Sequence, residues 1–207
     1  MTQTTNTRKR TLYLVQLTVL IAILLLLEVT GLGYIKTPGI EFTIMTVPVI
    51  VGAMILGPGA GTVLGTVFGL TSFFQALSGK SPFGAMLLNL NPVGTFITTV
   101  PTRVLVGLLC GLIYVALKKH SSHKTLRYTL ASLSGALLNT ILFMSTLLLF
   151  FYNSELLQGF AQQLGTNSPI TFVFAFVGVQ GLLEALICAV LGTAIAQALA
   201  RSLKIDN

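Results

Sequence analysis

Three polar residues interrupt apolar stretches of the sequence where they can carry chemistry: Arg103, Asn139 and Glu184. At a helical rise of about 1.5 Å per residue, each lies roughly 18–25 Å from the nearest basic cluster on its own stretch. An ionisable group at that depth in a membrane is a functional candidate, because burying it in hydrocarbon is costly. The planar guanidinium of Arg103 can bind both oxygens of a carboxylate. The pattern therefore predicts a polar pocket for a small acidic ligand.

A second interpretation of the same residues is open. Arg103 and Glu184 can form an ion pair that joins two helices without any ligand, since a charge inside a membrane needs a partner in either case. Arg103 shares a four-residue row with Gly107 and Gly111, so we expect it to face the bundle interior. Gln180 precedes Glu184 by one helical turn and can add a neutral contact.

Two loops at the same end of these stretches supply further polar groups. They read "YIKTPGIE" from Tyr34 and "SGKSPFGAMLLNLNP" from Ser78, and they can act as lids over a site or as ordinary connections. Glu28 lies near the outer end of the first apolar stretch, where we expect an interfacial position. The candidate ligand-binding residues are Arg103, Asn139, Asn89, Asn91, Gln180, Glu184, Gln75, Lys36 and Tyr34.

Residue combinations typical of enzymes and metal sites are missing from the sequence. No P-loop pattern occurs, so the chain has no evident means of hydrolysing ATP. Cys110 and Cys188 stand singly in apolar stretches without metal-ligand spacing. His120 and His123 lie in a basic loop without other ligands, which favours a solvated loop over a metal pair. We therefore predict no catalytic residues, no metal site, no cofactor and no enzyme activity.

The composition identifies the elements that must position the polar residues. The chain has 207 residues, of which 54% are hydrophobic and 8% charged, with a mean hydropathy of +0.89. Soluble domains carry about a quarter charged residues, so we predict an integral membrane protein built of helices. The expected fold is an all-α bundle of six transmembrane helices in a single domain, 1–207. The expected spans are Thr11–Thr30, Phe42–Leu56, Ala60–Leu77, Pro92–Leu117, Thr125–Tyr152 and Pro169–Ala200.

The charge distribution predicts the orientation of these spans. With six spans, the basic clusters at residues 8–10, 118–127 and 201–204 all fall on one face of the membrane. The positive-inside rule makes that face cytoplasmic, so both termini should be cytoplasmic and the chain should be a multi-pass protein of the cell membrane. Contact with anionic lipid accounts for the net charge of +7. Nucleic acid is not an expected partner.

Glycines recur every fourth residue in "GPGAGTVLGTVFG", at Gly57, Gly61, Gly65 and Gly69. Small residues at this spacing let helices approach closely in lipid. The favoured interpretation is packing inside the bundle, and a docking face for another subunit is the alternative.

The chain resembles the substrate-binding (S) components of energy-coupling factor (ECF) vitamin transporters. The most specific segments are "PVIVGAMILGPGAG" and "RVLVGLLCGLIY", and the likeness covers nearly the whole chain. The resemblance implies a six-helix protein that captures a vitamin outside the cell. It implies as partners a transmembrane coupling subunit and two ATP-binding-cassette ATPases, which supply the ATP hydrolysis.

Within that family the sequence looks most like the pantothenate-type group. Riboflavin, folate and pyridoxine-type vitamins are alternative ligands, and a stand-alone secondary transporter is an alternative function. Family members often carry alanines four residues apart on the first helix, whereas here only Thr18 and Ala22 have that spacing. The expected docking residues are accordingly Thr18 and Ala22 together with the four spaced glycines.

Overall fold

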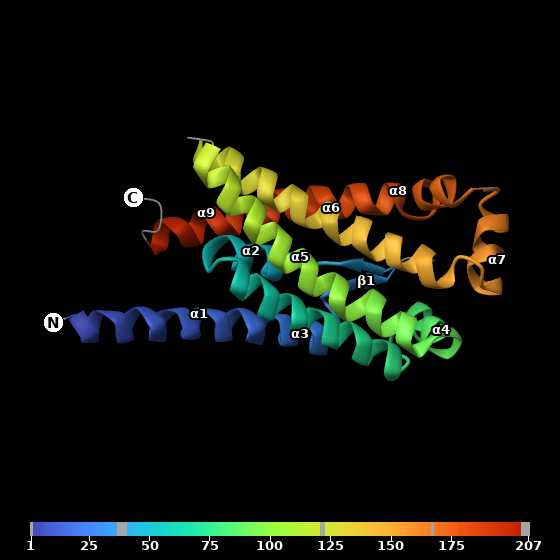
Figure 1. Cartoon of the computed structure of the whole chain (residues 1–207), viewed down its shortest axis with the longest axis horizontal. Helices are drawn as coiled ribbons and strands as arrows, with labels where there is room; N and C mark the ends of the chain where they lie inside the picture. The colour runs from blue at the N-terminus through green and yellow to red at the C-terminus, as the bar shows by residue number, and fades with distance from the viewer. Residues whose placement is uncertain (1, 37–40, 121–122, 167, 204–207) are drawn as a thin grey trace.

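The computed structural model describes residues 2–36, 41–120, 123–166 and 168–203, and within them the chain is almost entirely helical. The long helices run roughly parallel to one axis of the molecule (Figure 1). The elements in chain order are α1 Thr2–Thr30, β1 Tyr34–Lys36, β2 Glu41–Thr43, α2 Thr46–Ile55, α3 Pro58–Leu77, α4 Pro82–Leu90, α5 Pro92–His120, α6 Lys124–Phe151, α7 Glu155–Gln163, α8 Pro169–Ile187, the π-helical segment η1 Cys188–Gly192, and α9 Thr193–Ser202.

Within the described residues, five helical segments are long and apolar enough to cross a membrane. A hydrocarbon core of about 30 Å requires roughly 20 helical residues, and these segments meet that length. This confirms the predicted helical membrane protein. The segments are Thr7–Thr30, Pro58–Leu77, Pro92–His120, Lys124–Phe151 and Gly181–Ser202.

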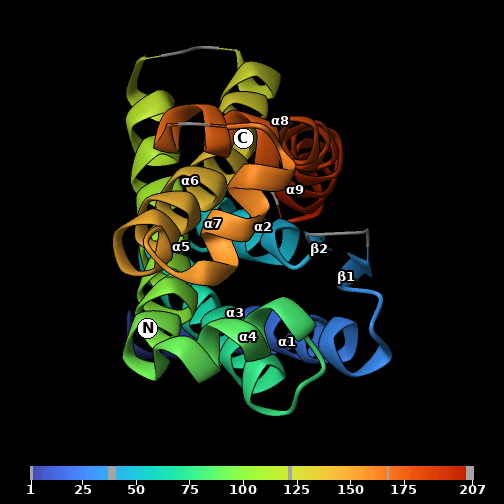
Figure 2. The same cartoon turned by 90° about the vertical axis from the view of Figure 1, so that its right-hand side faces the viewer.

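The second expected span, Phe42–Leu56, differs from the structure. Helix α2 begins only at Thr46 and has ten residues, of which Thr46 through Met54 are all buried. Ten residues rise about 15 Å, which is half of a hydrocarbon core. The helix ends where Gly57 adopts a φ of 96° and Pro58 starts α3. Figure 2 shows α2 near the middle of the bundle, enclosed by the longer helices.

A small antiparallel hairpin precedes α2, where the sequence predicted a loop. Tyr34 pairs with Thr43, and Lys36 pairs with Glu41. The hairpin is the one departure from the all-α prediction among the described residues. It lies at the edge of the bundle, beside α2 (Figure 2).

Two short helices lie at the end of the molecule opposite both termini (Figure 1). Helix α4 occupies much of the loop expected from Ser78 to Pro92. Its start follows a local rule, because the Ser81 side chain accepts from the Gly84 amide and Pro82 stands at the first helical position. Helix α7 begins in the same way, with the Ser154 side chain accepting from the Leu157 amide.

The spaced glycines of α3 pack against α5 of the same chain. A Cβ at Gly61 would meet the Gly107 carbonyl, a Cβ at Gly65 would meet the Arg103 carbonyl, and one at Gly69 would lie 2.7 Å from Val100 Cα. The face that carries Gly61, Gly65 and Gly69 is filled by α5, as the packing interpretation expects. The docking role of these glycines stays a prediction.

The other predicted docking residues have different surroundings. Gly57 lies in the turn before α3, and its positive φ of 96° is a conformation that glycine adopts readily. Thr18 and Ala22 lie on the exposed side of α1, which packs loosely on the bundle. Among the predicted docking positions, Thr18 and Ala22 on α1 are the ones that lie on an exposed helix face.

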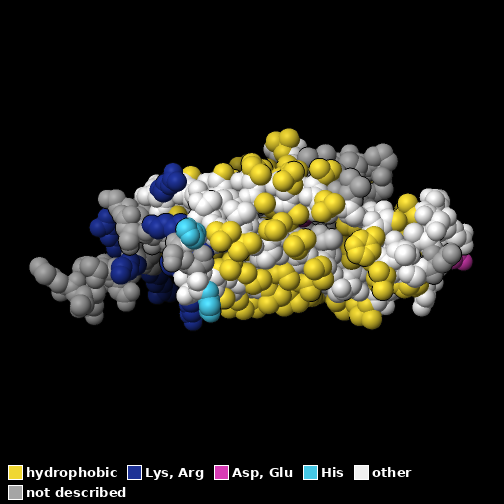
Figure 3. Space-filling view, turned by 90° about the horizontal axis from the view of Figure 1, so that it is seen from above, with side chains coloured by type: hydrophobic (Ala, Val, Ile, Leu, Met, Phe, Trp, Pro, Cys, Tyr) yellow, Lys and Arg dark blue, Asp and Glu magenta, His cyan; other side chains and the backbone are white. Residues whose placement is uncertain are grey.

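The two ends of the molecule differ in charge. Basic side chains gather at the end that holds both termini, and an acidic side chain marks the opposite end (Figure 3). The basic residues include Lys118 and Lys119 in the last turn of α5 and Arg201 in the last turn of α9. Between the ends, the face seen in Figure 3 carries many apolar side chains.

Candidate ligand-binding site

Arg103 lies in the middle of the bundle on α5 and is only 8% exposed. Its Nη1 donates to the Thr98 carbonyl at 3.0 Å and to Thr102 Oγ1 at 3.1 Å. Its Nε is buried and has no hydrogen-bond partner. The guanidinium is therefore held at one corner, while other donors stay available.

The first half of α5, which precedes Arg103, contains several threonines that form hydrogen bonds within the helix. Thr95, Thr99 and Thr102 each donate their hydroxyl to the carbonyl four residues earlier. Such bonds use the hydroxyl hydrogens within the helix, and the Thr102 oxygen still accepts from Arg103 Nη1. The same segment carries Pro101, which lacks an amide hydrogen and leaves one helix carbonyl without its usual donor.

Two aromatic rings flank the Arg103 guanidinium. The Phe143 ring centroid lies 4.8 Å from its central carbon, and the Phe68 centroid lies 5.4 Å away. Both distances are within the range of cation–π attraction, which strengthens where water is excluded. The rings stabilise a buried cation without neutralising its charge.

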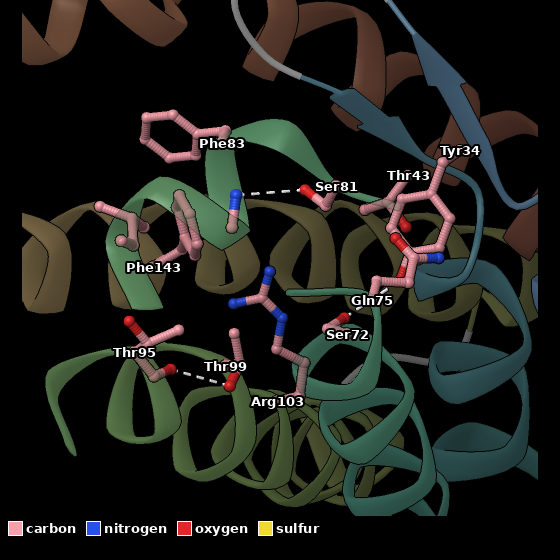
Figure 4. A pocket seen from close by; sticks show the side chains of 12 residues that line it. Tyr34, Thr43, Ser72, Gln75, Ser81, Phe83, Thr95, Thr99, Arg103 and Phe143 are labelled. Atoms are coloured by element: carbon pink, nitrogen blue, oxygen red, sulfur yellow. Dashed lines mark hydrogen bonds between the residues drawn. The ribbon is translucent and has the colours of Figure 1, made fainter. Parts of the chain in front are cut away.

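A cavity of about 100 Å³ lies beside Arg103. Figure 4 shows side chains from the hairpin, α3, α4, α5 and α6 converging on it. Its lining combines hydroxyls and an amide with aromatic and aliphatic groups: Tyr34, Thr43, Ser72, Gln75, Ser81, Phe83, Gly84, Leu87, Thr95, Thr99, Arg103 and Phe143.

Glu184 forms no direct hydrogen bond or ion pair with Arg103. Its Oε1 accepts from Thr46 Oγ1 at 3.1 Å and from Asn139 Nδ2 at 2.9 Å. Among the described side chains, no carboxylate forms an ion pair with the Arg103 guanidinium. The ion-pair interpretation of the sequence is therefore wrong for this structure.

Gln75 is fixed by a carboxyl group on another helix. Its Nε2 lies 2.8 Å from both oxygens of Glu28 on α1. Glu28 was expected at the interface, with a role near the pocket as the alternative. Its carboxyl group turns inward to α3 and contacts Gln75. Nearby, the Tyr34 hydroxyl lies 3.0 Å from Ser72 Oγ.

The residues predicted from the sequence fall into three groups. Arg103, Gln75 and Tyr34 line the cavity. Asn139 and Glu184 are buried in the interior as a separate hydrogen-bonded pair, and neither is among the residues lining the cavity. For all five, a role in ligand binding stays a prediction.

The remaining predicted residues lie elsewhere. Asn89 is exposed, and Asn91 caps α5 by accepting from the Gly94 amide at 2.9 Å. The side chains of Lys36 and Gln180 lie outside the part that the structure describes.

The sequence reasoning missed several lining residues, among them Thr95, Thr99, Phe83 and Phe143. A signal existed for the threonines, since Thr95 and Thr99 stand eight and four residues before Arg103 and so share its helix face. No comparable signal marks the two phenylalanines, which come from other helices and resemble ordinary core residues.

The fold and the cavity define a multi-pass helical membrane protein with an internal pocket next to a buried cation. The family model described as "ECF transporter, substrate-specific component" matches residues 12–196. The chain belongs to this family, and it is accordingly a multi-pass transport protein of the plasma membrane.

Two curated relatives are similar over most of the chain. The pantothenic acid transporter PanT of Lactococcus lactis subsp. cremoris is 32% identical over 169 residues, covering 77% of this chain and 78% of the relative. The pantothenate transporter PanT of Leuconostoc mesenteroides subsp. mesenteroides is 32% identical over 139 residues, covering 64% of this chain and 66% of the relative.

Proposed function

We propose that the chain captures pantothenate from outside the cell as the substrate-binding subunit of an ECF importer. The observation that carries the proposal is Arg103, a buried cation beside a cavity, without a carboxylate partner among the described side chains. The two relatives named as pantothenate transporters support the choice of ligand. Pantothenate has a carboxylate at one end and two hydroxyls at the other, which suits a pocket with one cation and several polar groups.

The pantothenate carboxylate would bind the Arg103 guanidinium. Arginine–carboxylate hydrogen bonds are charge-assisted and often bidentate, which adds directional specificity. Because Nη1 already donates to Thr98 and Thr102, the guanidinium is oriented before the ligand arrives. Phe68 and Phe143 exclude water from the cation, so its attraction to an anion exceeds that in solvent.

Ligand uptake into this cavity requires movement of its lining. A cavity of about 100 Å³ is smaller than the roughly 300–1,000 Å³ of pockets for drug-sized ligands. The hairpin and α4 supply Tyr34, Thr43, Ser81 and Phe83 to the lining. We infer that these two elements move apart to admit the ligand.

In this proposal the whole chain, 1–207, acts as one membrane domain with a defined orientation in the membrane. Six crossing segments would place both termini and the basic end in the cytoplasm, following the positive-inside rule. The hairpin with α2 would form the second crossing. The end that carries α4 and α7 would then face the outside, where the vitamin is captured.

The energy for transport would come from partners. Two ATP-binding-cassette ATPases would hydrolyse ATP, because this sequence holds no P-loop. A transmembrane coupling subunit would connect them to this chain. The exposed side of α1 at Thr18 and Ala22 is the proposed docking face. Small residues there permit close helix approach in lipid.

Ligand titration of the purified chain in detergent, without ATPases, tests the proposed capture function. Calorimetry should give saturable, one-to-one binding of pantothenate. The alcohol analogue, in which a hydroxymethyl group replaces the carboxylate, should bind about a hundredfold more weakly, since loss of a buried charged partner costs several kcal/mol. Equal affinity for both compounds, or tighter binding of riboflavin, folate or pyridoxine, would contradict the proposal.

Docking on α1 has its own test. Replacing Ala22 with tryptophan should reduce co-purification of the chain with its coupling subunit at least about tenfold, because a bulky ring prevents close helix packing. Ile23→Trp is the matched control, because Ile23 is an exposed residue of the same helix that lies about 100° around the helix axis from Ala22. Pantothenate affinity should not change in either variant, and equal complex yields would place the docking face elsewhere.

A further inference from the structure

The pair formed by Glu28 and Gln75 connects the first helix to the cavity. Gln75 is 8% exposed and lines the cavity from α3, whereas Glu28 is a half-buried residue of α1 that is not among the lining residues. The two carboxyl oxygens of Glu28 both lie 2.8 Å from Gln75 Nε2. Glu28 therefore contacts the residue that lines the cavity and not the cavity itself.

The chemistry of this pair fixes the direction of the Gln75 amide. An ionised carboxylate only accepts hydrogen bonds, while an amide has a donor end and an acceptor end. Turning the amide over would bring its oxygen against the carboxylate oxygens. In Figure 4 the Gln75 nitrogen points away from Arg103, as this pairing requires. The amide oxygen, Oε1, is then the atom left for a ligand, and within the described part of the chain it receives no hydrogen bond.

We propose that Glu28 is a positioning residue. It orients the Gln75 amide so that the amide oxygen faces the cavity as a hydrogen-bond acceptor. The inference rests on the proposed function and deepens it, because it states which ligand group is recognised there. The ligand must bring a hydrogen-bond donor to Gln75 Oε1. The neighbouring Tyr34, Ser72 and Thr43 give this side of the cavity hydroxyl groups, so the group expected there is a ligand hydroxyl.

The same arrangement occurs a second time in the interior. Glu184 accepts from Asn139 Nδ2 at 2.9 Å, and the Asn139 oxygen is buried without a partner. In both pairs a carboxyl group accepts from the amide nitrogen and thereby fixes the direction of the amide, in Gln75 and in Asn139. Asn139 is not among the residues that line the cavity, so this second pair shows the same chemistry of an amide held by a carboxyl group and adds no ligand contact.

The variant Glu28→Gln tests the proposal, because a glutamine at position 28 can either accept from Gln75 or donate to it. The amide of Gln75 is then no longer held in one direction. The ligands are pantothenate and its two deoxy analogues, each lacking one hydroxyl, and the readout is the ratio of their dissociation constants. The wild-type chain should bind one deoxy analogue about tenfold more weakly than pantothenate, and Glu28→Gln should reduce that ratio to about threefold or less.

Two further variants separate positioning from a merely structural role. Glu155→Gln makes the same change at an exposed residue of α7 and should leave the ratio unchanged. The exchange Glu28→Gln with Gln75→Glu places an acceptor back at the cavity and should restore the ratio, even if overall affinity falls.

The possible results are distinguishable. If Glu28→Gln weakens all three ligands by the same factor, or if the wild-type chain binds both deoxy analogues as tightly as pantothenate, the role of Glu28 is overturned. If the wild-type chain does not bind pantothenate, the proposed function itself fails.

Discussion

Replacing Arg103 with methionine is expected to weaken pantothenate binding about a hundredfold or more, since truncating one partner of a buried charge pair costs about 2–5 kcal/mol. Methionine matches the length of the arginine stem and fits between Phe68 and Phe143. Thr98 keeps a hydrogen bond to its carbonyl, because the Thr102 hydroxyl also donates to it. The variant should therefore fold, with a melting temperature close to that of the wild type, and lose binding alone.

Arg127→Met is the matched control for this prediction. Arg127 is 7% exposed, against 8% for Arg103, and lies in the first turns of α6, toward the end that carries both termini. Its replacement should leave pantothenate affinity within about threefold of the wild-type value, as expected for distant, independent sites. Similar losses of binding in both variants, or a parallel loss of folding in Arg103→Met, would show that Arg103 acts through general stability.

The second large effect is expected from Gly65→Ala. The new methyl group would collide with the carbonyl oxygen of Arg103, which is backbone and cannot turn aside as a flexible side chain does. Overpacking costs about 1–3 kcal/mol, and at roughly 2–4 °C per kcal/mol for a chain of this size the melting temperature should fall by about 2–12 °C. Because the collision is with Arg103 itself, pantothenate affinity should fall as well.

Gly59→Ala is the matched control for Gly65→Ala, because it makes the same change in α3 at a position without close neighbours. Both glycines lie in α3, but a Cβ at Gly59 would meet no atom within 4 Å. Alanine also favours helix over glycine by up to about 1 kcal/mol, so thermal unfolding should occur at the wild-type temperature or slightly higher. If Gly65→Ala melts at the same temperature as Gly59→Ala, the close packing of α3 on α5 is not what holds these helices.

The parts of the fold that follow from local sequence were predictable. Long apolar stretches become helices in a membrane because their backbone groups must be satisfied internally, and the expected spans around α1, α3, α5 and α6 agree with the structure. The glycine spacing in α3 predicted close packing, and the partner helix is α5. The short helix α4 could also have been predicted, because Ser81 followed by Pro82 is a typical start of a helix.

Other features depend on tertiary contacts that no local pattern reveals. Helix α2 is short because a glycine turn follows it and a hairpin precedes it, so its apolar run extends beyond its helical part. Glu184 and Arg103 have opposite charges at similar depth, which suggested an ion pair. In the folded chain Thr46 and Asn139 occupy the carboxyl group instead. Glu28 and Gln75 are 47 residues apart, so their contact could not be predicted.

Determining an experimental structure of the chain with bound pantothenate tests the central claim most directly. We expect the ligand carboxylate within hydrogen-bonding distance of the Arg103 guanidinium, between Phe68 and Phe143, with α4 or the hairpin displaced to enlarge the cavity. A ligand bound elsewhere, or an Arg103 side chain turned onto Glu184 while the cavity stays empty, would contradict the account.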